Sequence, residues 1–159
     1  MEQNAPHIPV MLEEVLAALA PAADETYVDG TFGAGGYTRG MLDTADCNVI
    51  AIDRDPSAFT HAAPWKDQYG KRLTFVPGTF SQIKDHLATL GLKKIDALVL
   101  DIGVSSMQID QPERGFSFRF DAPLDMRMDT TQGQTAADVI NSLPEKELAD
   151  IVFNLGEER

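Results

Sequence analysis

The sequence predicts an α/β fold, a doubly wound parallel sheet with helices on both faces. Segments with strand character alternate with segments of helical periodicity over the first hundred residues. The run 95–100 is nearly all apolar, as in strands buried on both faces of a parallel sheet. The first strand leads into a glycine-crowded turn at 29–37. With 159 residues, the chain can bury one substantial core.

The elements follow in order along the chain. Strands are expected at 27–28, 48–52, 73–76 and 95–100. The first helix, 10–20, carries Leu12, Val15, Leu16 and Leu19 on one face, and Pro21 ends it. Further helices are expected at 37–42, from 56 onward, at 80–90 and at 144–155.

Local signals mark the helix ends. Asp55 is expected to cap a helix whose first turn holds Pro56. Thr79 is expected to cap 80–90, with Gly91 just past its end. A capping box begins at Thr135, and Gly156 is expected to end the last helix.

The character of the chain changes after residue 101. Residues 101–133 are rich in Gly, Pro, Asp, Ser and Met and show little periodicity, which is typical of a functional loop or lid. Open parallel sheets of this type usually have more than four strands. We therefore expect the architecture to be truncated in this chain.

Composition narrows the function classes. Acidic residues outnumber Lys and Arg by 25 to 13, and the net charge of −12 argues against a self-sufficient nucleic-acid clamp. No apolar run reaches membrane-spanning length and no secretory signal is visible, so we expect a cytoplasmic protein. Cys47 is the only cysteine and is expected to be buried; His7, His61 and His86 are scattered, so no metal site is expected.

The glycine-rich turn predicts a nucleotide-type cofactor site. Gly33 and Gly35 fit the dinucleotide pattern G-x-G-x-x-G, but its third position is Thr38. A cofactor without a pyrophosphate, such as S-adenosylmethionine, depends less on that third glycine. Asp53, at the end of the next strand, is the candidate ligand of the ribose hydroxyls, with Asp55 as the helix cap. The alternatives are a tight turn without a ligand and a solvated acid at a strand end.

A second candidate site follows the fourth strand. Asp101 stands where ligands bind in open α/β sheets, and a glycine turn with Ser105 and Ser106 comes next. These groups can orient a polar nucleophile beside a cofactor. The alternative is an ordinary strand-to-loop turn.

The long loop carries aromatic and basic residues. Its phenylalanines could stack on a base, although anchoring the loop to the core is the commoner role: Phe116, Phe118 and Phe120. Its arginines could contact phosphate or pair with nearby carboxylates: Arg114, Arg119 and Arg127, beside Asp121, Asp125 and Asp129.

Several motifs in order resemble the bacterial small-subunit ribosomal RNA cytosine-N4 methyltransferases (RsmH, also called MraW). They are the segments 29–36, 51–55, 101–106, 113–118, 123–129 and 156–159. The resemblance implies a Rossmann-like class I methyltransferase that uses S-adenosylmethionine. It implies cofactor contacts at Gly35, Gly36, Tyr37, Asp53, Phe80, Asp101 and Gln108. Tyr37 replaces the histidine of many members, and Met107 replaces their proline.

The resemblance also implies a substrate and a domain plan. The substrate is a cytidine in the decoding region of 16S rRNA, presented by the small ribosomal subunit. Family members are about twice as long, with a helical domain inserted into the sheet domain. On this plan 1–110 is the incomplete cofactor-binding core, 111–133 an active-site loop, and 134–159 the start of the inserted domain.

Two other classes stay open. One is a nicotinamide-dependent oxidoreductase, which the missing third glycine disfavours. The other is a cofactor-binding fragment without catalytic activity, because strands of the sheet are missing. The sequence also leaves a homodimer open.

Overall fold

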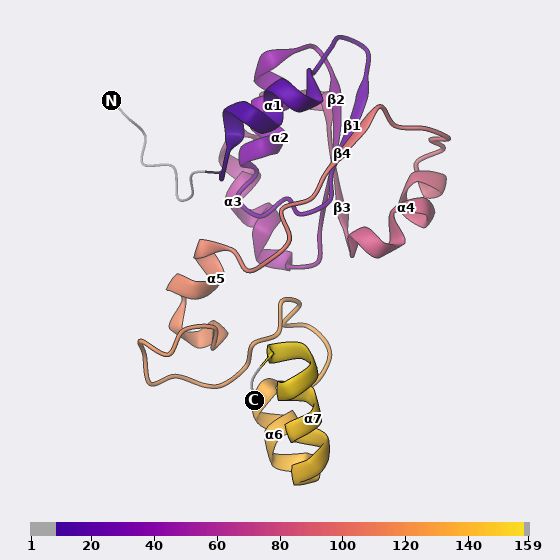
Figure 1. Cartoon of the computed structure of the whole chain (residues 1–159). Helices are drawn as coiled ribbons and strands as arrows, with labels where there is room; N and C mark the ends of the chain where they lie inside the picture. The colour runs from indigo at the N-terminus through magenta and orange to yellow at the C-terminus, as the bar shows by residue number, and fades with distance from the viewer. Residues whose placement is uncertain (1–8, 158–159) are drawn as a thin grey trace. The chain divides into compact units, whose positions relative to one another are not determined.

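The computed structural model describes residues 9–157, and the chain divides into two compact units, 1–105 and 106–159. Figure 1 shows the sheet and helices of the first unit and the helices of the second. His7, Glu158 and Arg159 lie outside the described residues.

The first unit is built on a parallel sheet of four strands in the order β3-β2-β1-β4. Its strands are β1 (Thr26–Asp29), β2 (Asn48–Asp53), β3 (Leu73–Pro77) and β4 (Ala97–Val99). Val28 is in register with Ile50 on one side and Leu98 on the other. The predicted α/β class and all four strands are confirmed, although β4 is shorter than the predicted 95–100.

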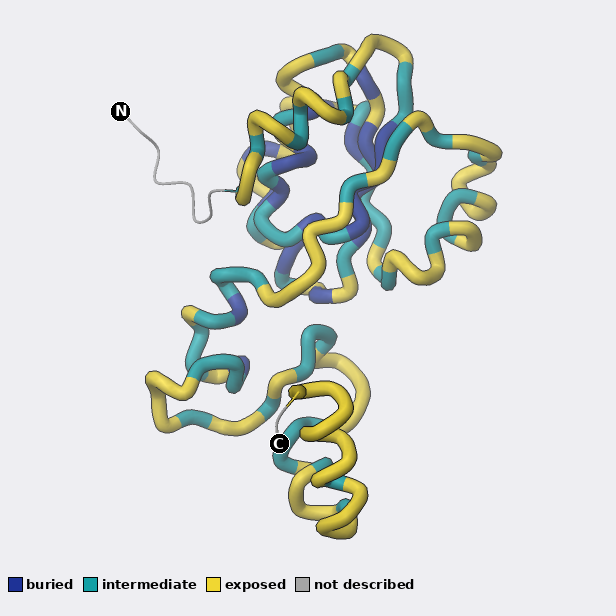
Figure 2. Tube along the Cα trace, in the orientation of Figure 1, coloured by how far each residue is buried: buried dark blue, intermediate teal, exposed yellow. Residues whose placement is uncertain are grey.

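The central strands are buried on both faces, as their apolar sequences predict. Tyr27, Val49 and Ala51 belong to one core cluster, whereas Val28 and Ile50 belong to a second. This division follows the two-residue period of a strand. Figure 2 shows buried residues concentrated along these strands.

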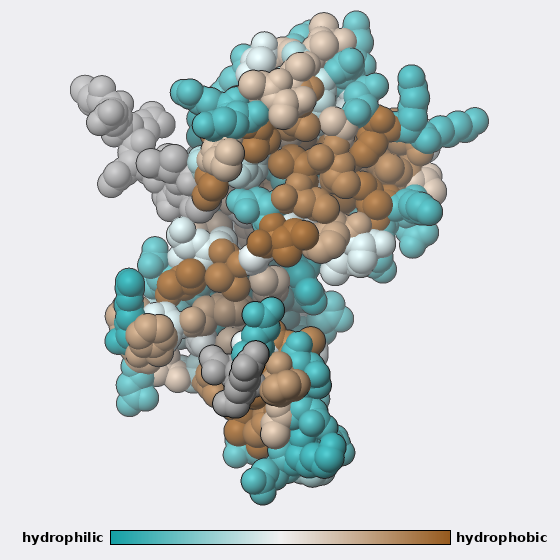
Figure 3. All heavy atoms as spheres, viewed as in Figure 1, coloured by the Kyte–Doolittle hydropathy of each residue, from teal (hydrophilic) through white to brown (hydrophobic). Residues whose placement is uncertain are grey.

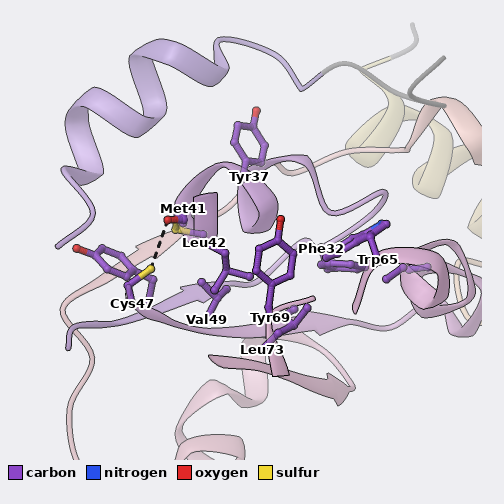
Figure 4. Packing of buried hydrophobic residues seen from close by; sticks show 13 residues of the cluster. Phe32, Tyr37, Met41, Leu42, Cys47, Val49, Trp65, Tyr69 and Leu73 are labelled. Atoms are coloured by element: carbon purple, nitrogen blue, oxygen red, sulfur yellow. Dashed lines mark hydrogen bonds between the residues drawn. The ribbon is translucent and has the colours of Figure 1, made fainter. Parts of the chain in front are cut away.

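Helices cover the two faces unequally. One face carries α1 (Leu12–Leu19), α2 (Gly36–Thr44) and α3 (Pro56–Lys66), and the other carries α4 (Ile83–Thr89) (Figure 1). The apolar side chains of α1 pack on the first cluster, as predicted. Figure 4 shows that cluster, in which Phe32 lies beside Trp65 and Cys47 is fully buried.

Most helix-end predictions are confirmed, and one is wrong. The carboxylate of Asp55 accepts a hydrogen bond from the Ser57 N–H at the start of α3. Gly91, with φ of +73°, follows α4. Thr79 does not cap, because its hydroxyl bonds to Ser81 and Gln82 side chains and the segment 80–82 forms a short 3-10 helix instead.

The edge strand β4 leaves apolar side chains uncovered in the first unit. Leu98 is 41% exposed, Leu100 38% and Phe80 40%. All three lie around Gly30, and Figure 3 shows hydrophobic residues gathered on this unit.

The second unit is mostly helical beyond its long loop. It contains α5 (Ser106–Asp110), a 3-10 turn (Pro112–Arg114), α6 (Ala136–Ser142) and α7 (Glu145–Gly156). The capping box at Thr135 is confirmed: its side chain accepts from the Asp138 N–H, and the Asp138 carboxylate accepts from Thr135 N–H. Within residues 9–157, no helix is long and apolar enough to cross a membrane.

Candidate cofactor site

The glycine-rich loop lies across the carboxyl ends of three strands. Gly30 N–H donates to the carbonyl oxygen of Val99 in β4 at 3.0 Å. Phe32 N–H donates to the carbonyl oxygen of Ile52 in β2 at 3.1 Å. The loop therefore joins the ends of β1, β2 and β4, the edge where open parallel sheets bind ligands.

Thr31 connects this loop to the segment after β4. Its hydroxyl accepts a hydrogen bond from the Asp101 N–H at 2.7 Å. Its own N–H donates to the Asp29 carboxylate at 3.3 Å. One side chain thus holds the start of the glycine loop against Asp101, which is exposed.

Asp29, the last residue of β1, is a fully buried carboxylate under the loop. Its Oδ2 accepts from the Thr38 hydroxyl at 2.7 Å. The pKa of Asp29 is raised to about 6, mainly by burial, with a smaller increase from the charge of Asp53; the hydrogen bonds from Thr38 and Thr31 oppose this increase. The threonine at the third-glycine position therefore has a structural role, because it satisfies this acid.

Asp53 is held in one orientation at the end of β2. Its Oδ2 accepts from Gly33 N–H at 2.8 Å, and its Oδ1 accepts from Asp55 N–H at 2.9 Å. Burial raises its pKa, and these backbone bonds counter part of the increase. A carboxylate has about four acceptor positions, so Asp53 retains capacity for two hydroxyl donors. This is not the solvated strand-end acid of the alternative interpretation.

The glycines of the loop are needed for different reasons. A Cβ on Gly35 would lie 2.7 Å from the rings of Phe32 and Trp65, and its φ is +79°. A Cβ on Gly36 would lie 1.9 Å from Pro9. A Cβ on Gly33, whose φ is +53°, would have only one atom within 4 Å, the carbonyl oxygen of Thr31 at 3.9 Å. Packing thus requires glycine at 35 and 36, whereas open space adjoins Gly33.

Tyr37, in the first turn of α2, is another predicted site residue, and it lies close to Asp101. Its hydroxyl donates to the Val10 carbonyl oxygen at 2.6 Å and lies 3.4 Å from Asp101 Oδ2. Burial raises the pKa of Tyr37, and the Asp101 charge adds to the increase. The phenol is therefore neutral and acts as a hydrogen-bond donor.

The site is acidic. Asp29, Asp53 and Asp101 make no ion pair with a basic side chain in the part of the chain that the structure describes. Of residues 9–157, no three His, Cys, Asp or Glu gather as metal ligands. Carboxylates without basic partners in a partly buried site favour a ligand with positive charge.

The other predicted residues are spread over the two units. Phe80 is the first residue of the 3-10 helix 80–82 and lies beside Gly30. Ser105 is the last residue of the first unit. Ser106 and Gln108, which is buried, belong to α5 of the second unit. Their part in a site stays a prediction. The sequence interpretation missed Thr31 and the Asp29–Thr38 pair, although a polar residue ending an apolar strand was a usable signal.

Comparison with known proteins identifies the family of this chain. The model of the MraW methylase family matches residues 4–159. Ribosomal RNA small subunit methyltransferase H of Rhodospirillum rubrum is 57% identical over 159 residues, which are 100% of this chain and 48% of that protein. The Maricaulis maris protein of the same name is 56% identical over 155 residues, 98% of this chain and 46% of that protein.

A solved structure supports the fold. Precorrin 8W decarboxylase of Methanobacterium thermoautotrophicum superposes with a TM-score of 0.50 at 22% identity, over 65% of this chain and 55% of that one. The chain spans about half the length of the curated relatives that it matches. Motif order, sheet topology and family match agree: this chain belongs to the MraW methylase family.

Proposed function

We propose that this chain carries the S-adenosylmethionine site of an enzyme that methylates N4 of a cytidine in the decoding region of 16S rRNA. The supporting observation is the glycine loop, which is tied to the ends of β1, β2 and β4 and surrounded by carboxylates that have no basic partner among the described residues. The names of the relatives, ribosomal RNA small subunit methyltransferase H, support an RNA substrate in the small subunit.

The residues present fit this cofactor. Asp53 is oriented by two backbone N–H groups and can accept from both ribose hydroxyls. The space beside Gly33 lets a ligand approach the backbone. The first turn of α2 offers N–H groups to a carboxylate, whereas Asp29 and Asp101 favour a positively charged group. S-adenosylmethionine combines a ribose, a carboxylate, an ammonium and a sulfonium.

The same charges disfavour a nicotinamide dinucleotide. Its pyrophosphate would bring two negative charges to a loop that already faces three carboxylates. The third-glycine position holds Thr38, whose side chain is engaged by Asp29. The oxidoreductase alternative thus has the weaker support.

For the reaction, we assign to Asp101 the orientation of the cytosine. S-adenosylmethionine supplies a methyl group on a sulfonium, and in-line transfer requires mainly alignment. Asp101 Oδ1 accepts no hydrogen bond in the described residues, so it can accept one from cytosine N4–H and direct the nitrogen lone pair. We also assign Ser105 and Ser106 as secondary contacts of the cytosine, and the family resemblance implies Phe80 and Gln108 as cofactor contacts. The base has to leave its stack to reach these groups.

The domain plan is part of the proposal. Residues 1–110 serve as the cofactor-binding core, 111–133 as the active-site loop, and 134–159 as the beginning of a helical domain. Because the chain spans 48% of a relative's length, a second candidate function is cofactor binding without methyl transfer.

Transfer of a labelled methyl group to undermethylated small ribosomal subunits tests the proposal. A full-length protein in which these 159 residues replace the matching part of a relative should label a cytosine of the subunit RNA, and Asp101→Ala in that protein should lose incorporation while it remains folded. Asp85→Asn, which changes an exposed acid of α4, is the matched control. If the 159-residue chain binds cofactor yet labels nothing, the second candidate holds for this chain. Near-normal incorporation by folded Asp101→Ala would refute the role of Asp101.

A further inference from the structure

Residues 115–125 form a closed loop in the second unit. Gly115 adopts φ of +72°, and a Cβ there would lie 2.6 Å from both Asp125 N and Pro123 O. Just outside the loop, Met126 N–H donates to Arg114 O at 2.9 Å. The two ends of the loop are therefore in contact, and the residues between them project as one compact surface loop.

Two of the three arginines hold the base of this loop. The buried Arg114 donates through Nη2 to the carbonyl oxygens of Arg127 and Met128, at 3.0 and 2.9 Å. Arg127 pairs with Asp125 through two hydrogen bonds, at 2.9 and 2.7 Å. This pairing lowers the pKa of Asp125 to about 2. Arg127 thus pairs with a nearby carboxylate, which is the second of the two roles expected for the arginines. The side chains of Arg114 and Arg127 are both engaged within the loop and are not offered to a ligand.

The tip of the loop is different. Phe118 is fully exposed, and Phe120 is 48% exposed. The exposed Arg119 makes no ion pair in the described residues, and its N–H donates to the Ser117 hydroxyl oxygen at 3.2 Å, which tightens the turn. Phe116 alone is half-buried, with the Arg114 guanidinium 6.0 Å from its ring centre. Among residues 9–157, Phe118 therefore does not anchor the loop to a core, although anchoring was the commoner role expected for these phenylalanines.

We propose that Phe118 and Arg119 form a docking site for an unpaired RNA nucleotide, with the base on the ring and the phosphate on the guanidinium. This inference rests on the proposed function, which supplies the RNA substrate. An aromatic face accepts any base by stacking. A guanidinium outside any ion pair matches a phosphate by bidentate hydrogen bonding. In a chain of net charge −12, an exposed arginine that directly follows an exposed phenylalanine in the sequence is a feature that complements RNA.

The base of the loop that carries the pair is preorganised. Because backbone bonds and the Arg114 and Arg127 contacts fix this base, docking at the tip does not have to order it. Less conformational entropy is then lost on binding. A flexible tip with the same residues would bind more weakly.

A short single-stranded RNA that contains 2-aminopurine provides the test, since stacking on an aromatic ring quenches its fluorescence. The 159-residue chain is titrated at low salt without a methyl donor, so a failure of methyl transfer does not affect the result. We expect quenching with the native chain and with Phe118→Trp. Phe118→Leu should weaken binding about tenfold and abolish the quench, because leucine is apolar but cannot stack.

Phe153→Leu is the matched control, since Phe153 is a 58% exposed phenylalanine of α7 in the same unit; it should bind as the native chain does. Arg119→Gln should weaken binding and flatten its dependence on salt. Circular dichroism verifies folding. The proposal is overturned if the native chain shows no quench, or if Phe118→Leu binds as tightly as the native chain. The latter result would assign the ring to packing against protein.

Discussion

Replacing the buried Asp29 by asparagine should stabilise the fold at neutral pH while weakening the cofactor site. Asparagine keeps the shape of the side chain: its Oδ1 can accept from Thr31 N–H, and its amide can donate to the Thr38 hydroxyl. What it removes is a charge that has no basic partner in the described residues. A buried charge without such a partner costs free energy.

The size of the effect follows from the pKa of Asp29. Folding raises it from 3.8 to about 6, which corresponds to about 3 kcal/mol at 1.36 kcal/mol per pKa unit. The folded state therefore binds the proton more tightly than the unfolded state does. The stability that the fold gains from this tighter proton binding is fully present below about pH 4. It is lost as pH rises through about 6.

Urea unfolding, followed by the fluorescence of the single Trp65 in the core, measures this contribution at about pH 4.5 and about pH 7.5. The free energies of unfolding of the native chain and Asp29→Asn should be close at the lower pH and differ by up to about 3 kcal/mol at the higher pH, with the variant more stable. The exposed Asp67→Asn controls for general charge effects. If the variant is destabilised equally at both pH values, the charge of Asp29 is not what limits stability.

Three further changes test the loop and its surroundings. Thr31→Val should cost about 0.5–1.5 kcal/mol of stability and weaken cofactor binding, because Asp101 N–H loses its acceptor, whereas Thr31→Ser should restore both in unfolding and titration experiments. Gly35→Ala should lower the free energy of unfolding by more than about 2 kcal/mol, since its methyl would meet Trp65 at 2.7 Å and φ is +79°; an unchanged melting temperature would contradict this. Thr135→Ala should reduce the helicity of the second unit at a cost of about 1 kcal/mol, and Thr135→Ser should not.

Local chemistry made much of the fold predictable. The apolar runs of β2 and β3, the cap at Asp55 and the capping box at Thr135 depend on neighbours in the sequence, and all four are confirmed. The Thr79 cap failed because nearby side chains compete for its hydroxyl. β4 is shorter than its apolar run because pairing with β1, not hydrophobicity, sets its length.

The site was predictable only in outline. The sequence placed Asp53, Asp101 and the glycine loop at one sheet edge, and the structure joins the loop to both segments. It could not show that Gly35 packs against Trp65, or that Thr38 satisfies a buried acid, because those contacts are made by the folded chain. It likewise could not show which phenylalanines of the long loop are exposed, because exposure depends on the folded chain.

Calorimetric titration of the 159-residue chain with S-adenosylmethionine, S-adenosylhomocysteine and NAD would decide whether the glycine loop holds a methyl donor. We predict saturable binding of S-adenosylmethionine, no binding of NAD, and roughly 10- to 100-fold weaker binding by Asp53→Asn, which loses charge-assisted hydrogen bonds to the ribose. S-adenosylhomocysteine lacks the sulfonium charge, so the difference between its affinity and that of S-adenosylmethionine measures how much the carboxylates of the site contribute to binding that charge. Failure to bind S-adenosylmethionine, or equal binding of NAD, would contradict the assignment of this site.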